Sequence, residues 1–199
     1  MKNNEEHQKS EIYEKVLLKN HEFSEFKKYF KRMEVPAKTV LLSEGEISRK
    51  IFFIEKGCIR AWINNGGKDV SFQFFFENSA VSSIESFQKN IPSQVYLETV
   101  EPSVLWFTYK KDVDQIISEI LDNQELREKI VHMIFQRTFD YMKHFLSFIR
   151  DTPQQRYLNL TRENPQLIRR IPAHYIASYL GISTVHLSRI KSKLLKENR

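Results

Sequence analysis

The last thirty residues constrain the fold most, because a glycine stands between two short amphipathic segments. Ile176 and Leu180 are four residues apart, which places both on one face of a helix. Gly181 stands where the chain needs a sharp turn, and Ser183 is a good N-cap for the next helix. Further apolar residues recur at spacings of three and four and predict the buried face of a second helix; they are Leu187, Ile190 and Leu194. This pattern indicates a helix-turn-helix, with a plain helical hairpin packed on the rest of the protein as the alternative.

The other sides of the second predicted helix carry polar and basic side chains and almost no acid. This composition favours DNA as the partner, with the helix in the major groove. Arg189 is the first candidate for reading a base, because its guanidinium matches O6 and N7 of guanine. Further candidates for base edges are Thr184 and Val185, with His186 and Ser188 placed at bases or phosphates. The candidates for phosphate contacts are Ser183, Lys191, Lys193 and Arg170.

The distribution of charge supports a polyanionic partner for the C-terminal segment. Residues 150–199 contain ten Lys or Arg and three Asp or Glu, a net charge of +7 within a chain total of +6. The other 149 residues are therefore close to neutral, with a net charge of −1. A basic segment on a neutral body is typical of nucleic-acid binding, although a solvated basic face would give the same count.

Cysteine usage and hydropathy narrow the class of protein. Cys58 is the only cysteine, which excludes a disulfide within the chain and any all-cysteine metal site formed by one chain. It lies in an apolar alternation, so we expect it to be a small core residue. The first residues are polar and show no signal-peptide pattern, and no apolar run reaches the ~18 residues of a membrane span. We therefore expect a cytoplasmic protein without a membrane partner.

The middle of the chain reads as β structure. Residues 11–34 predict one or two short amphipathic helices, and residues 35–109 then change to short β-branched and aromatic runs separated by turn residues. Asn64-Asn65-Gly66-Gly67 between two alternating runs predicts a hairpin. Short strands at regular spacing predict an antiparallel jelly-roll barrel or sandwich. The runs expected to form strands are 38–43, 51–55, 58–64, 69–76, 95–100 and 103–109.

A long helix is expected after the barrel, from about Asn123 to Arg150, within a dimerisation region of about 112–150. One apolar stripe follows coiled-coil spacing and is the candidate dimer seam: Val131, Ile134, Thr138, Tyr141, Phe145 and Phe148. A second stripe runs beside it: Phe135, Phe139, Met142, Leu146 and Ile149. One stripe can cover the helix's own barrel, and the other then needs a partner. A homodimer is favoured over a monomer with an unusually buried helix, and the sequence leaves open which stripe is the seam.

Asp151-Thr152-Pro153 marks the predicted hinge, which divides the chain into an effector domain at 1–150 and a DNA-binding domain at 151–199. After it we expect a short helix over Gln154–Glu163 that ends at Asn164-Pro165, and then a short strand or wing over Gln166–Ile171. The predicted fold class is α+β: an N-terminal antiparallel jelly-roll barrel, a long dimerisation helix and a C-terminal winged-helix or helix-turn-helix domain.

This order of elements resembles the Crp/Fnr superfamily of bacterial transcription regulators over almost the whole chain. The matching residues are Gly45 and Gly57 at barrel turns, the strand end Phe52–Gly57, and the two tail segments Ile176–Ser183 and Leu187–Arg189. The tail motif is specific, whereas the barrel motif is shared by cyclic-nucleotide-binding barrels of unrelated proteins. The resemblance implies an effector-controlled dimer that binds a two-fold DNA site.

The resemblance also implies where an effector would bind. Members that bind cyclic AMP carry a Gly-Glu pair, a short helix and an Arg-Ser pair, and here Ser82-Ser83 and Ser93-Gln94 stand at those places. Because a buried cyclic phosphate needs a cationic partner, the sequence argues against cyclic nucleotide binding. A pocket for an apolar or aromatic effector is one reading of the nearby rings, and a simply filled barrel is the other; the rings are Phe72, Phe74, Phe76, Phe87 and Tyr96.

No enzyme, metal site or cofactor is expected. Residues 22–131 contain no histidine, which argues against a haem sensor and against a metal-dependent cupin. No nucleophile–base spacing and no phosphate loop are present. The sequence therefore predicts a dimeric transcription regulator, with double-stranded DNA, a second copy, a small-molecule effector and RNA polymerase as candidate partners. The alternative is an effector-binding module that signals through a protein partner.

Overall fold

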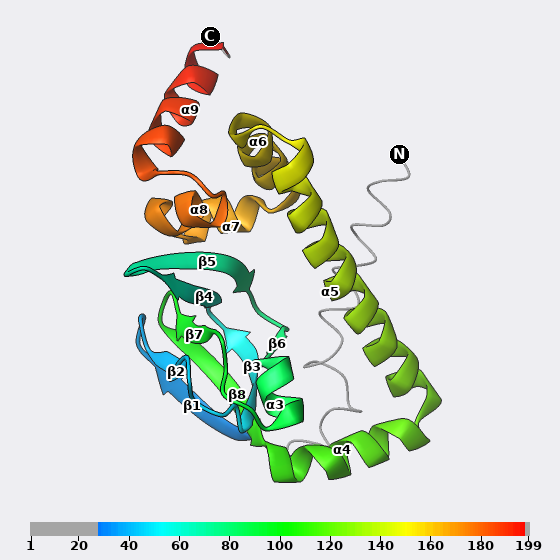
Figure 1. Cartoon of the computed structure of the whole chain (residues 1–199). Coiled ribbons are helices and arrows are strands. Elements are labelled where there is room, and N and C mark those ends of the chain that lie inside the picture. The colour runs from blue at the N-terminus through cyan, green and yellow to red at the C-terminus, as the bar shows by residue number, and fades with distance from the viewer. Residues whose placement is uncertain (1–27, 198–199) are drawn as a thin grey trace. The chain divides into compact units, whose positions relative to one another are not determined.

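The computed structural model describes residues 28–197 (Figure 1). Within these residues eight strands come first and helices follow from Lys110 onward, with one short helix inserted among the strands. The strands are β1 (Lys31–Val35), β2 (Val40–Leu42), β3 (Lys50–Lys56), β4 (Ile59–Asn65), β5 (Lys68–Phe75), β6 (Ala80–Val81), β7 (Tyr96–Thr99) and β8 (Ser103–Tyr109). The helices are α3 (Ile84–Lys89), α4 (Lys110–Asp122), α5 (Gln124–Arg150), α6 (Pro153–Glu163), α7 (Pro165–Arg170), α8 (Ala173–Tyr179) and α9 (Thr184–Glu197).

The strands form two four-stranded sheets, as the jelly-roll prediction required. One sheet has the order β1-β8-β3-β6 and the other the order β2-β7-β4-β5. The pairings of β8 with β1 and β3 are antiparallel, and Phe52 on β3 faces Phe107 on β8 and Val81 on β6. Ile54 and Leu105, opposite each other in the same register, are fully buried. The predicted α+β class, with an antiparallel jelly-roll domain followed by a helical region, is confirmed.

The β4–β5 hairpin forms at the predicted place. β4 ends at Asn65 and β5 begins at Lys68, so that Gly66 and Gly67 make a two-residue loop. Both glycines have positive φ, +61° and +83°, as the type I′ hairpin turn requires. The side-chain oxygen of Asn64 accepts a hydrogen bond from the Gly67 N–H at 2.8 Å.

Two local predictions were wrong. Residues 31–34 were expected to be helical, but they belong to β1, whose register pairs Lys31 with Phe107 and Val35 with Ser103. A strand partner far along the chain thus overrides the local pattern; residues 11–27 of that prediction lie outside the described residues. Gln166–Ile171 was expected to be a strand or wing, but α7 occupies most of it, with Pro165 at its first turn.

The chain divides into two compact units. The first comprises Met1–Arg60 and Phe75–His132, and the second comprises Ala61–Phe74 and Met133–Arg199. In the first unit Cys58 is fully buried, as expected of a core residue. The core of the second unit includes Tyr157, Leu160, Leu167, Ile171, Tyr175, Ile176, Leu180, Leu187 and Ile190. None of the helices within residues 28–197 is long and apolar enough to cross a membrane.

Candidate nucleic-acid interface

The α8–turn–α9 segment (Ala173–Glu197) is built from the residues that the sequence singled out. Ile176 and Leu180 are 1% and 2% exposed on the α8 side, and Leu187 and Ile190 are 1% and 5% exposed on the α9 side. Gly181 has a φ of +67°, which glycine adopts without strain. The predicted apolar stripes are therefore buried at these four positions, whereas Leu194, the third member of the α9 stripe, is half-buried. The opposite side of α9 faces solvent.

The first turn of α9 is capped by a side chain. Ser183 Oγ accepts a hydrogen bond from the His186 N–H at 3.1 Å, which satisfies one of the free donors at the helix start. No acidic residue lies in this first turn, and the only acid of α9 is Glu197 at its end. The helix N-terminus carries partial positive charge, so this end of α9 is suited to anions.

The predicted DNA-contacting residues fall into two groups. At 100° per residue, Val185, Arg189 and Lys193 share one side of α9, and all three are exposed. Exposure is also found at Thr184, His186, Ser188 and Ser183. Lys191 is different, because it is half-buried and its Nζ lies 5.9 Å from the centre of the Tyr157 ring. Arg170, at the end of α7, is half-buried as well.

The exposed lysine Lys193 makes only weak intramolecular contacts. Its Nζ donates to Gln154 Oε1 at 3.2 Å and lies 3.7 Å from Glu197 Oε1, and its side chain is 62% exposed. Solvent-exposed ion pairs contribute little to stability, so a phosphate can replace these partners at small cost.

The residues at the expected effector cassette form a closed serine network, which we define as Ser48, Ser82, Ser83, Ser86 and Ser93. Ser82 Oγ donates to the Lys50 carbonyl at 3.1 Å and lies 3.0 Å from Ser48 Oγ. Ser86 Oγ accepts from the Ser48 N–H at 2.9 Å and donates to the Ile91 carbonyl at 2.6 Å.

Ser93 and Ser83 form a second bonded pair within this network. Its Oγ lies 3.0 Å from Ser83 Oγ and donates to the Val95 carbonyl at 2.8 Å. Its backbone N–H and C=O bond to Glu46 and Gly45, each at 2.8 Å. Ser93 is 2% exposed, whereas Gln94 beside it is exposed. The hydroxyl groups at this place are thus occupied by the protein itself.

The rings predicted to line an effector pocket differ in environment. Phe87 is buried, with Lys110 Nζ 5.4 Å from its ring centre. Phe74 is buried, and its ring meets Tyr179 edge-on at 5.4 Å between centres. The remaining three, Phe72, Phe76 and Tyr96, are half-buried.

The buried ion pair between Arg60 and Glu98 was not predicted from the sequence. Arg60 on β4 is 1% exposed and Glu98 on β7 is 6% exposed, and Arg60 Nη2 donates to Glu98 Oε2 at 2.9 Å. Each is a charged residue within an apolar run, Cys58–Trp62 and Val95–Val100 respectively, and that is the signal that could have found the pair. The pair bridges the neighbouring strands β4 and β7, and removing one partner would leave an uncompensated buried charge.

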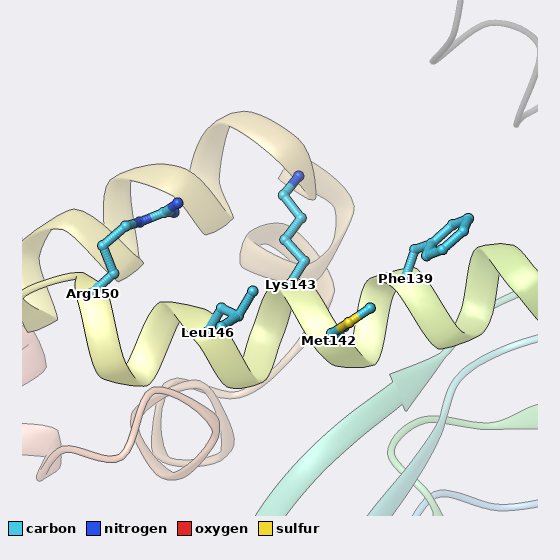
Figure 2. Close-up of a pocket in the computed structure, with 5 residues that line it drawn as sticks. All are labelled: Phe139, Met142, Lys143, Leu146 and Arg150. Carbon is cyan, nitrogen blue, oxygen red and sulfur yellow. The ribbon is translucent and has the colours of Figure 1, made fainter.

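The second half of α5 exposes a broad apolar surface. Phe145 and Ile149 are 64% and 71% exposed. Both predicted stripes contribute to it, since their other members are exposed as well: Val131, Ile134, Phe135, Thr138, Phe139, Tyr141, Met142, Leu146 and Phe148. A pocket of about 230 Å³ lies along one side of this surface. Figure 2 shows the side chains that line it, which are Phe139, Met142, Lys143, Leu146 and Arg150.

One edge of α5 is covered within its own unit. Phe148 lies under the α8–α9 turn, where a Cβ on Gly181 would come within 2.8 Å of the Phe148 ring. His144 stacks on Tyr179 with ring centres 4.2 Å apart, and its burial lowers the pKa of the imidazole. Burial also raises the pKa of Tyr141, which lies on the same side of α5. This edge of the predicted seam therefore packs partly on the chain itself, and Tyr141 and Phe148 remain 40% and 41% exposed.

Comparison with known proteins identifies the first domain. Residues 32–119 match the cyclic nucleotide-binding domain family. They form such a domain, as the resemblance predicted. No curated protein sequence matches the chain significantly.

Solved structures extend the likeness to most of the chain. The c-di-GMP responsive global regulator CLP of Xanthomonas campestris aligns with a TM-score of 0.72 and 14% identity, over 88% of this chain and 91% of its own. A CooA mutant from Carboxydothermus hydrogenoformans aligns with a TM-score of 0.70 and 13% identity, over 91% and 83%. The catabolite activator protein of Thermus thermophilus gives 0.54 and 18%, over 94% and 88%. These are Crp/Fnr regulators rather than enzymes, and the chain has their fold.

Proposed function

We propose that this protein is a dimeric, sequence-specific DNA-binding transcription regulator of Crp/Fnr type, with α9 as the helix that enters the major groove. The observation that carries the proposal is the division of α9 into a side buried at Leu187 and Ile190 and an exposed side with basic residues and no acid before Glu197. The C-terminal DNA-binding domain is taken to begin at the hinge Asp151–Pro153, with residues 1–150 as the effector domain.

Arg189 is the proposed base reader, because its exposed guanidinium can bond both acceptors of a guanine edge. Thr184 and Val185 stand at the start of the helix, where a recognition helix meets base edges. Ser183, Lys193 and Arg170 are proposed to contact phosphates, with His186 and Ser188 at either. Lys191 is the weakest candidate, because its ammonium already lies over Tyr157.

The dimer is proposed to form through the uncovered side of α5. We call Ile134, Phe135, Thr138, Met142, Phe145 and Ile149 the α5 face; on a helix they project to one side, away from the edge that carries His144 and Phe148. Contiguous apolar surface of this kind marks an interaction site. A second α5 is its occupant, because the spacings of three and four are those of a helix pair. Relative to the sequence prediction, the seam moves away from Tyr141 and Phe148.

Cyclic nucleotides do not fit the cassette of this chain. A cyclic phosphate would need a cation and free donors, but three of the four cassette positions, Ser82, Ser83 and Ser93, carry hydroxyls that bond other serines and nearby carbonyls, and the fourth is the uncharged Gln94. The domain family is therefore named for a ligand that this cassette is not built to hold. Any effector would be of another class and would use other residues, with the neighbouring rings as candidates.

The proposal places the protein in a bacterial cytoplasm, where its DNA site and RNA polymerase are found. Titration of duplex DNA at several salt concentrations tests it: we expect a steep salt dependence together with preference for particular sequences. Binding without sequence preference, or with no salt dependence, would instead favour a module that signals through a protein partner.

A further inference from the structure

Arg156 on α6 lies where three segments of the second unit meet. Its Nη1 donates to the Asp151 carbonyl at the hinge, at 2.8 Å, and its Nη2 donates to the Leu180 carbonyl at the end of α8, at 3.0 Å. The guanidinium carbon lies 4.6 Å from the centre of the Phe148 ring on α5. One side chain therefore connects the last turn of α5, the hinge and the α8–α9 turn.

The surroundings of Arg156 hold it in this geometry. The Asp151 carboxylate accepts from Arg150 Nε at 2.8 Å and from Asn159 Nδ2 at 3.1 Å, and these bonds lower the pKa of that carboxyl. Thr152 and Gln155 form a capping box at the start of α6, with both reciprocal bonds present. The hinge backbone to which Arg156 bonds is thus fixed on each side.

The turn that Arg156 bonds is the one that sets the direction of α9. Phe148 already fills the space where a side chain at residue 181 would lie, so the turn rests on α5 through Gly181. The bond from Arg156 to the Leu180 carbonyl ties the same turn to α6. A lysine could not replace the guanidinium here, because an ammonium lacks the planar fork that spans two carbonyls while stacking on a ring.

We infer that Arg156 is the positioning residue that fixes α9 at a defined angle to α5 and so determines the spacing of the two half-sites in the DNA target. This rests on the proposed function, because two copies paired through α5 would present their α9 helices at a separation set by this junction. A shift of one base pair moves a half-site by about 3.4 Å along the duplex. A loosened junction would therefore tolerate spacings that the native protein rejects.

The first test measures binding to a set of duplexes that carry the same half-sites at spacings varied one base pair at a time. The native protein is expected to prefer one spacing at least tenfold. Arg156→Met is expected to bring neighbouring spacings within about threefold, while its affinity for a single half-site stays unchanged. Arg162→Met is the matched control, because Arg162 is exposed on the same helix and bonds only neighbouring side chains there. Unchanged spacing preference in Arg156→Met would overturn the inference.

The second test needs no DNA and so separates this inference from the proposed function. Spin labels at Gln136→Cys on α5 and Ser192→Cys on α9, both exposed positions, report the distance between the two helices. With labelled protein diluted in excess unlabelled protein, the native background and Arg162→Met should give one narrow distribution. Arg156→Met, and also Arg156→Lys if the first variant folds poorly, should give a broad one. A narrow, unshifted distribution in a folded Arg156 variant would refute the role of Arg156, whether or not the native protein selects a DNA sequence.

Discussion

The serine network and the exposed side of α9 both carry many hydrogen-bonding side chains, but these side chains have opposite environments. In the network, hydroxyl groups bond one another and backbone carbonyls, and Ser93 is almost fully buried. On α9, Ser188, Arg189 and Lys193 project from the protein surface. The difference teaches that the polar groups at the expected effector cassette are already hydrogen-bonded within the protein, whereas those on α9 are exposed and can bond a partner.

The largest effect on DNA binding by α9 is expected from a charge in the α5 face, because that face is proposed to hold the two copies together. Phe145→Glu would place a carboxylate in an apolar helix pair, so monomers are expected and the affinity for a two-fold DNA site should fall at least about hundredfold, because linkage of two binding modules is lost. Sedimentation and duplex titration measure the two effects. Gln136→Glu, on a polar side of α5, is the control and should stay dimeric. A dimeric Phe145→Glu protein would reject this seam.

The buried Arg60–Glu98 pair lies in the same unit as the serine network and tests whether polar groups there are shielded from water. Glu98→Ala leaves the Arg60 guanidinium without its carboxylate inside the protein, and the free energy of unfolding should fall by ~3–5 kcal/mol. Denaturant unfolding measures this loss. Glu85→Ala removes a carboxylate from an exposed pair with Lys89 and should cost about 1 kcal/mol or less. Equal losses in the two variants would show that the Arg60–Glu98 pair is not sealed from water.

Base reading by α9 is the next test in size. Arg189→Ala should cost ~1–3 kcal/mol per half-site at one base pair and abolish discrimination there. Lys193→Ala should weaken all sequences about equally and reduce the salt slope by about 1. Competition between duplexes that differ at single positions distinguishes the effects of the two variants. If Arg189→Ala also weakens every sequence alike, Arg189 is a phosphate contact.

Removing one hydroxyl from the serine network should have a smaller effect. Ser93→Ala takes away the partner of Ser83 and of the Val95 carbonyl, and should lower the free energy of unfolding by ~1–2 kcal/mol. DNA affinity should stay unchanged, because the closed network takes no part in binding. A Ser93→Ala protein with native stability but altered DNA binding would contradict the comparison.

The smallest expected effect is none. Adding cyclic AMP should leave the midpoint of thermal unfolding unchanged, because a ligand that does not bind the folded state does not stabilise it. Thermal unfolding at increasing nucleotide concentration measures this. A rise in the midpoint that grows with concentration would show that the network opens to admit a phosphate.

The parts of the molecule that sequence could predict are those built from short-range contacts. The spacing of Ile176, Leu180, Leu187 and Ile190 depends only on helix geometry, and the two glycines of the β4–β5 hairpin depend only on turn geometry. The strand at Lys31–Val35 was missed because its partner β8 lies about seventy residues away. At Gln166–Ile171 the short apolar run fits either a strand or a helix, and the N-terminal proline decides for the helix.

In the candidate site, too, the features set by local helix geometry were predictable from the sequence, and those set by distant contacts were not. The exposed positions of α9 follow from its period, but the half-burial of Lys191 does not, since Lys191 meets Tyr157 from α6. The bonds of Ser82 to Ser48 and to Lys50 join residues more than thirty positions apart, and they exist only once the strands have paired. The sequence could show that an arginine is missing from the cassette, but not that the serines bond one another there.

Selection of bound duplexes from a random library tests the central claim most directly. The account predicts that the native protein enriches a two-fold symmetric sequence whose half-sites lie about one helical turn, ~34 Å, apart, and that Arg189→Ala loses one base pair of it in each half. A library that emerges without enrichment, or with a motif that Arg189→Ala leaves intact, would contradict the assignment of α9 as the reading helix.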